Sequence, residues 1–281
     1  MGEGSQSLLY DICRLFLEPG DQVMGIGPCY AEFASDVGMW GADYDFVPLR
    51  PENRFAFDLN EMLSRLDSRH KLVYIDTPNN PTGQAVPLEQ VEALVARAEE
   101  LSIPIIVDEA YGDYLPQSWS AISLTGRYDN LAVLRSFSKA HGLAGARAGY
   151  GILPQQLCVP LDNITHPYIC SSPARAIAQA ALEDEGFLEH TRTVTAQFKA
   201  PFLRDWSKLF TCHTHPETPI FLLSHPDPQV ELKRAFDPFH IKVVSGNVFV
   251  GLGKNSVRMR APLLQDQAAV LQAIEEIDRT Y

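Results

Sequence analysis

The chain has 281 residues, of which 46% are hydrophobic, and a formal net charge of −12. This length allows one large domain or two modest ones, the apolar share argues against global disorder, and the acidic balance disfavours general binding to nucleic acid. No apolar run is long enough to span a bilayer, and the first residues lack the pattern of a secretory signal. Five scattered cysteines without a CxxC pair indicate neither a zinc knuckle nor a disulfide framework, so we expect a cytoplasmic protein without bound metal.

The first half of the chain alternates between predicted helices, strands and loops. Helices are predicted from apolar residues at helical spacing, the first of them capped by Ser5, and strands from short apolar runs. The predicted helices cover residues 5–17, 30–39, 58–66 and 88–101, and the predicted strands cover residues 22–26, 44–48, 71–76, 103–107, 130–134 and 147–152. This alternation predicts an α/β fold with a mostly parallel sheet covered by helices.

The second half differs in character. Two helices are predicted over residues 172–182 and 187–209, the second long and kinked at Pro201. Short strands over residues 219–223, 241–244 and 257–260 and a closing helix over 264–280 follow. We therefore expect a large domain over residues 1–185 and a smaller α+β C-terminal domain over residues 186–281, which begins with the long connecting helix.

One stretch of small residues, SFSKAHGLAGARAGYG at 136–151, carries the strongest chemical signal. Its lysine, Lys139, follows a predicted buried strand, and active-site groups of α/β proteins gather where such strands end. Ser136, Ser138 and Arg147 could hold a phosphate beside a reactive amine. The plain alternative is a solvated surface lysine.

Five short motifs extend this pattern along nearly the whole chain: GEGSQ at the start, PNNPTG, DEAY, SFSK followed by GARAGYG, and VRMR near the end. In this order and spacing the chain resembles the fold-type I pyridoxal-phosphate enzymes, within them the class I/II aminotransferases, and most of all the histidinol-phosphate aminotransferase branch. The resemblance implies an aminotransferase that uses pyridoxal 5′-phosphate, an amino donor such as an L-amino acid or an amino-alcohol phosphate, and a 2-oxo acid. It also implies a homodimer.

The resemblance assigns a role to each motif. Lys139 matches the lysine that bonds to the cofactor aldehyde and then moves protons as a base. The residues that match cofactor contacts are Gly4, Ser5, Gln6, Tyr30, Asn80, Asp108, Tyr111, Ser136, Ser138, Lys139 and Arg147. Backbone N–H groups at the start of a helix suit a phosphate, which gives the opening turn an independent physical reason; alone, that turn would more often be a plain helix cap.

The remaining matches concern the cofactor ring and the substrate. Asp108 matches the carboxylate that keeps the ring nitrogen protonated, and Tyr111 and Asn80 match groups that hydrogen-bond the ring oxygen. Tyr30 matches an aromatic that stacks on the ring, although a core tyrosine is nearly as good an interpretation. Arg258 matches the arginine that binds the substrate carboxylate, and Arg260 would share its face on a strand. By the same resemblance, the Asn80–Pro81 bond is a candidate for the cis form.

The sequence departs from the family pattern at its beginning, which lies almost at the phosphate turn. Relatives carry a substantial segment before this turn that completes the smaller domain and helps gate the site, so we expect that segment to be lacking. Residues 4–6 would then lie on a frayed terminus. Two alternatives stay open: a pyridoxal-phosphate decarboxylase of the threonine-phosphate decarboxylase type, and a catalytically impaired fragment.

Overall fold

The computed structural model describes residues 1–281, apart from the side chain of Glu185. Its larger part is a six-stranded sheet with the strand order β2-β1-β3-β4-β5-β6. The strands are β1 (Gln22–Gly27), β2 (Asp43–Pro48), β3 (His70–Asp76), β4 (Ile105–Asp108), β5 (Leu131–Ser136) and β6 (Gly149–Ile152). The first five are parallel and β6 is antiparallel to β5, so the mostly parallel α/β fold predicted from the sequence is confirmed.

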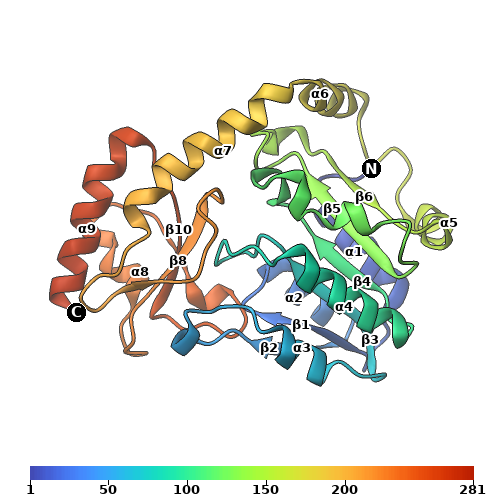
Figure 1. Cartoon of the computed structure of the whole chain (residues 1–281), viewed down its shortest axis with the longest axis horizontal. Helices are drawn as coiled ribbons and strands as arrows, with labels where there is room; N and C mark the ends of the chain where they lie inside the picture. The colour runs from blue at the N-terminus through green and yellow to red at the C-terminus, as the bar shows by residue number, and fades with distance from the viewer.

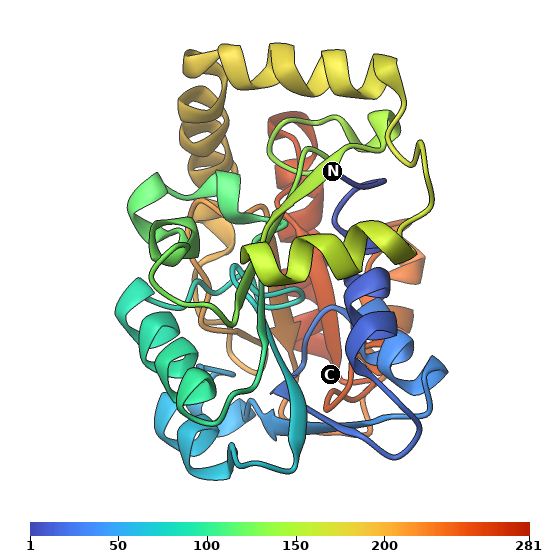
Figure 2. The ribbon, with the colours of Figure 1, turned by 90° about the vertical axis from the view of Figure 1, so that its right-hand side faces the viewer.

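Helices cover both faces of this sheet, which explains why the central strands read as nearly continuous apolar runs. In Figure 2, α1 (Gln6–Phe16) and α2 (Ala31–Met39) lie on one side of the sheet, and α3 (Leu59–Arg65) and α4 (Leu88–Glu100) lie on the other. Asp58 caps α3 by accepting a hydrogen bond from Glu61 N at 3.0 Å. None of the described helices has the length and apolar character needed to cross a membrane.

The C-terminal part has its own sheet and its own core. The sheet order is β7-β8-β10-β9, with β7 (Phe210–Thr211), β8 (Ile220–Ser224), β9 (Val244–Ser245) and β10 (Ser256–Arg260), all antiparallel. Phe202, Phe221 and Phe236 are fully buried there against α9 (Gln267–Thr280), and the short α8 (Leu232–Ala235) packs on β10. Figure 1 shows α7 (Glu185–Lys199) running from α6 (Ser172–Glu183) towards this part.

The structure differs from the predicted elements at several places. The strand expected over residues 241–244 is reduced to the two-residue β9 (Val244–Ser245). The long helix expected over residues 187–209 ends at Lys199, because Pro201 closes the chain into a 3-10 turn over Ala200–Phe202. A helix that was not predicted, α5 (Gln155–Ile164), carries Pro160 in its interior. The Ser5 side chain makes no capping hydrogen bond to α1.

Candidate active site

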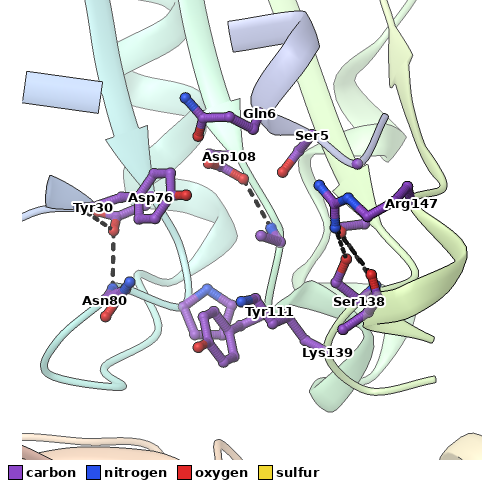
Figure 3. Close-up of a pocket in the computed structure, with 15 residues that line it drawn as sticks. Ser5, Gln6, Tyr30, Asp76, Asn80, Asp108, Tyr111, Ser138, Lys139 and Arg147 are labelled. Carbon is purple, nitrogen blue, oxygen red and sulfur yellow. Dashed lines mark hydrogen bonds between the residues drawn. The ribbon is translucent and has the colours of Figure 1, made fainter. Parts of the chain in front are cut away.

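A cavity of about 160 Å³ lies where β1, β3, β4 and β5 end, at the carboxyl edge of the parallel sheet (Figure 3). Such edges are where open α/β sheets bind ligands. All eleven residues predicted to contact a cofactor line this one cavity, although they come from segments far apart in the sequence: Gly4, Ser5, Gln6, Tyr30, Asn80, Asp108, Tyr111, Ser136, Ser138, Lys139 and Arg147. The fold therefore brings the predicted set together.

The opening turn is docked against the sheet instead of frayed. Gly2 N donates to Gly149 O at 2.9 Å, and Gly149 N donates back to Gly2 O at 3.1 Å. A Cβ at Gly149 would lie 2.3 Å from the backbone of Gly4, so the two backbones can approach only because residue 149 is glycine. The first turn of α1 is thereby held at the cavity with its N–H groups unused by the helix, and Ser5 keeps its hydroxyl available.

Arg147 closes the same end of the cavity. Its guanidinium donates to Glu3 O at 3.0 Å, to Ala144 O at 3.1 Å and to Ser138 Oγ at 3.5 Å. Arg147 itself has a left-handed backbone with φ of 52°, which is uncommon for a residue with a side chain and is often found at functional sites. This end combines one cation, two serine hydroxyls and a helix N-terminus, which together suit a phosphate.

Asp108 lies deep at the other end of the cavity. Its carboxylate accepts hydrogen bonds from Tyr74 Oη at 3.2 Å and from Ala110 N at 3.0 Å. Burial raises the pKa of Asp108 to about 6, even though its two hydrogen bonds and the charge of Lys139 act against that rise. A carboxylate held this deep fits a basic ring nitrogen, with which it can share a proton.

Lys139 and Tyr111 form the floor between these ends. The Lys139 ammonium lies over the Tyr111 ring, 5.4 Å from its centre. Part of the lysine side chain is open to solvent, but burial of the rest, together with the nearby charge of Arg258, lowers the pKa of Lys139. A lowered pKa increases the share of neutral amine, which is the form that can act as a nucleophile or base.

Asp76 is a second buried carboxylate on the cavity wall, and sequence reasoning missed it. It ends β3 directly opposite Asp108 in the register with β4. Its Oδ2 accepts from Tyr30 N at 3.1 Å and from Asn80 N at 2.9 Å, so one carboxylate fixes two loops that face the cavity. Burial raises the pKa of Asp76 to about 7. The one feature of the sequence that could have identified Asp76 is its place as an acidic residue at the end of the otherwise apolar strand KLVYID.

Arg258 lies beside the cavity, on β10 of the C-terminal sheet. Its Nη1 donates to Asn80 Oδ1 at 2.8 Å, which joins the two sheets at the site. Arg258 and Arg260 both line a neighbouring pocket together with Lys139 and Tyr111, as expected for alternate residues on one strand. The Asn80–Pro81 bond, a candidate for the cis form, is trans; the cis bonds are Gly27–Pro28 and Thr77–Pro78.

The comparisons with known proteins agree with this geometry. The family model for aminotransferase class I and II matches residues 1–277. The chain belongs to this family. It is similar to histidinol-phosphate aminotransferase 2 of Ralstonia nicotianae, with 35% identity over 211 residues that cover 74% of this chain and 55% of the relative. It is also similar to histidinol-phosphate aminotransferase of Methanococcus maripaludis, with 30% identity over 67% of this chain and 50% of the relative.

Solved structures of this family share the fold. Histidinol-phosphate aminotransferase from Sinorhizobium meliloti, solved in complex with pyridoxal-5′-phosphate, has 26% identity and a TM-score of 0.84 over 99% of this chain and 76% of that chain. The enzyme from Clostridium acetobutylicum has a TM-score of 0.85 at 22% identity, over 100% of this chain and 83% of that chain. The chain spans about half the length of the two curated relatives named above.

Proposed function

We propose that this chain is a pyridoxal 5′-phosphate-dependent aminotransferase that moves an amino group between a histidinol-phosphate-like amino-alcohol phosphate or an L-amino acid and a 2-oxo acid. The observation that carries the proposal is the single cavity that joins the Lys139 amine, the buried Asp108 carboxylate and the hydrogen-bond donors at Ser5, Ser138 and Arg147. The family and the cofactor complex of the Sinorhizobium relative support the same cofactor, which the sequence also predicted.

The two ends of the cavity fit the two charged ends of this cofactor. The N–H groups at the start of α1, the serine hydroxyls and the Arg147 guanidinium would hold the phosphate. Asp108 would hold a proton at the ring nitrogen, and Tyr30, whose amide is fixed by Asp76, would lie against the ring. When bound, pyridoxal 5′-phosphate supplies an aldehyde for amines and a ring that withdraws electrons from the substrate α-carbon.

The remaining residues would act on the substrate. Arg258 would bind its carboxylate or another anionic group through a planar pair of donors, and its bond to Asn80 orients the guanidinium. The Lys139 amine, with its lowered pKa, would take a proton from the substrate α-carbon. It would then deliver that proton to C4′, the carbon that carries the aldehyde in the free cofactor. A 2-oxo acid would then accept the amino group in the second half of the reaction.

The activity can be tested by incubating the purified chain and pyridoxal 5′-phosphate with histidinol phosphate or a panel of L-amino acids, in the presence of 2-oxoglutarate. We expect glutamate to form, and the reaction to disappear in Lys139→Ala but not in Lys233→Ala, which changes an exposed lysine of α8. Release of CO₂ without glutamate would favour the decarboxylase alternative, and the absence of both products would contradict the proposal.

We also propose a homodimer located in the cytoplasm, and a division of the chain into a large domain over residues 1–185 and a C-terminal domain over 186–281. The two sheets and their separate cores support the division. Exposed apolar side chains support the dimer: Val159 is 64% exposed and Tyr168 is 96% exposed. Light scattering on the purified chain would give twice the monomer mass if the dimer forms, and the monomer mass otherwise.

A further inference from the structure

Lys199, in the last turn of α7, is a fully buried lysine that the proposed reaction does not use. Its Nζ contacts four oxygen atoms of the segment over residues 214–220. These are Thr214 Oγ1 at 2.6 Å, His215 O at 2.7 Å, Ile220 O at 2.9 Å and Thr218 Oγ1 at 3.1 Å. No carboxylate of the described residues forms an ion pair with it.

The four oxygens form a cage suited to a cation. Two are backbone carbonyls, which can only accept hydrogen bonds. The Thr218 hydroxyl donates to Gly83 O at 2.7 Å, so it too faces Nζ as an acceptor. A neutral amine has only two N–H donors, whereas an ammonium has three. Burial lowers the pKa of Lys199 to about 7, but three obligate or engaged acceptors around Nζ favour the charged form over the neutral amine.

The caged segment also holds the loop over residues 79–83, whose Asn80 lines the candidate cavity. His215 N donates to Gly83 O at 2.9 Å, and Gly83 N donates to Asn79 O at 2.7 Å. A Cβ at Gly83 would lie 2.2 Å from Ile220 O, so the two backbones are in close contact. Ile220 in turn begins β8 and pairs with Arg260 of β10, two residues from Arg258.

We propose that Lys199 is a positioning residue: its internal ammonium fixes the 214–220 segment against the 79–83 loop and thereby sets where Arg258 meets Asn80. The cage ties the end of α7 to the 214–220 segment. That segment in turn holds the loop after β3, because His215 N and Thr218 Oγ1 both donate to Gly83 O. This role of Lys199 exists in the chain without cofactor or substrate and is independent of the proposed function.

The test uses Lys199→Ala, which removes the ammonium and leaves space for a small amine. Hydrogen exchange is measured by mass spectrometry on peptides covering residues 79–84 and 213–220, with Lys208→Ala as a control at an exposed lysine. We expect exchange to accelerate at least about tenfold in both peptides and not in β4 or β5. Added propylammonium should restore protection, whereas tetramethylammonium, which has no N–H donor, should not.

Exchange in Lys199→Ala equal to that in Lys208→Ala, or acceleration that neither amine changes, would overturn the proposal. If Lys199→Ala does not fold, Lys199→Met gives the answer, because it keeps most of the buried stem and lacks the donors. Faster exchange confined to the same two peptides of Lys199→Met would support the proposal, and wild-type exchange there would overturn it.

Discussion

The two ends of the candidate cavity are built in different ways. The end at Ser5 and Arg147 is built from hydrogen-bond donors: the main-chain N–H groups of a helix N-terminus, serine hydroxyls, and a guanidinium fixed by the carbonyls of Glu3 and Ala144. The opposite end concentrates buried ionisable side chains, and both Asp76 and Asp108 have raised pKa values there. Main-chain donors can bind an anion without titrating, whereas buried side chains can exchange protons with a ligand.

This difference separates binding from chemistry. Changes at the Arg147 end are expected to alter cofactor affinity, because that end supplies donors to a phosphate. Changes at the Asp108 end are expected to alter the rate, because that end controls where protons lie. Each substitution below tests whether the two ends can be separated in this way.

The largest effect is expected from Asp108→Asn. An amide has nearly the same shape as the carboxylate but cannot hold a proton at a ring nitrogen. Amino transfer should fall by about a hundredfold or more, while cofactor affinity changes much less. Steady-state rates and a cofactor titration measure the two quantities, with Asp129→Asn at an unrelated loop as the control. A normal rate in Asp108→Asn would remove the distinction between the ends.

Arg147→Ala should show the opposite pattern. Loss of a charge-assisted contact to a phosphate costs about 1.5–3 kcal/mol, which corresponds to roughly 10- to 100-fold weaker cofactor binding. The rate at saturating cofactor should change less than the affinity. Arg147→Lys keeps the charge without the planar pair of donors and should lie between the two. Equal affinity in all three proteins would contradict the assignment of this end.

Substitution of Gly149 tests whether docking of the opening turn matters for cofactor binding. Gly149→Ala would place a Cβ 2.3 Å from the backbone of Gly4 and displace the turn. Overpacking of this kind costs about 1–3 kcal/mol, and we expect cofactor affinity to fall about tenfold. Gly145→Ala is the matched control in the same region, since its Cβ would have nothing within 4 Å. Equal affinities in both variants would show that the turn does not contribute.

The smallest effect concerns stability without cofactor. The pKa of Asp76 rises from 3.8 to about 7 on folding, so the folded chain keeps a proton that the unfolded chain loses. Stability should therefore fall as pH rises from about 4 to about 7. In Asp76→Asn the free energy of unfolding should depend less on pH. At pH 8 it should exceed that of the wild type by about 1–2 kcal/mol, after allowing for the hydrogen bonds that the substitution removes. Urea unfolding at pH 5 and pH 8 measures the difference, and parallel changes in both proteins would exclude Asp76 as the cause.

The sequence predicted the parallel core well, because strands buried on both faces are continuous apolar runs such as KLVYID and IPIIV. It failed at two helices that contain or meet a proline. The apolar pattern continues past Lys199, but Pro201 ends the helix and Phe202 turns into the C-terminal core. Helix α5 was missed because Pro160 in its interior argues against a helix.

The predicted and the missed site residues differ in where their signal lies. All predicted residues except Tyr30 belong to motifs that resemble a known family, so their neighbours in sequence identified them. Asp76 belongs to no such motif, and its importance depends on the amide of Tyr30, 46 residues away. Lys199 likewise looks like an ordinary helix-end cation until the 214–220 segment folds over it.

The central claim is that Lys139 is the amine that carries the cofactor. The most direct test is to mix the purified chain with pyridoxal 5′-phosphate, reduce with borohydride, digest, and map the modified peptide by mass spectrometry. We predict one phosphopyridoxyl group per chain, on the peptide that contains Lys139. Modification of a different lysine, or no modification at any lysine, would contradict the claim.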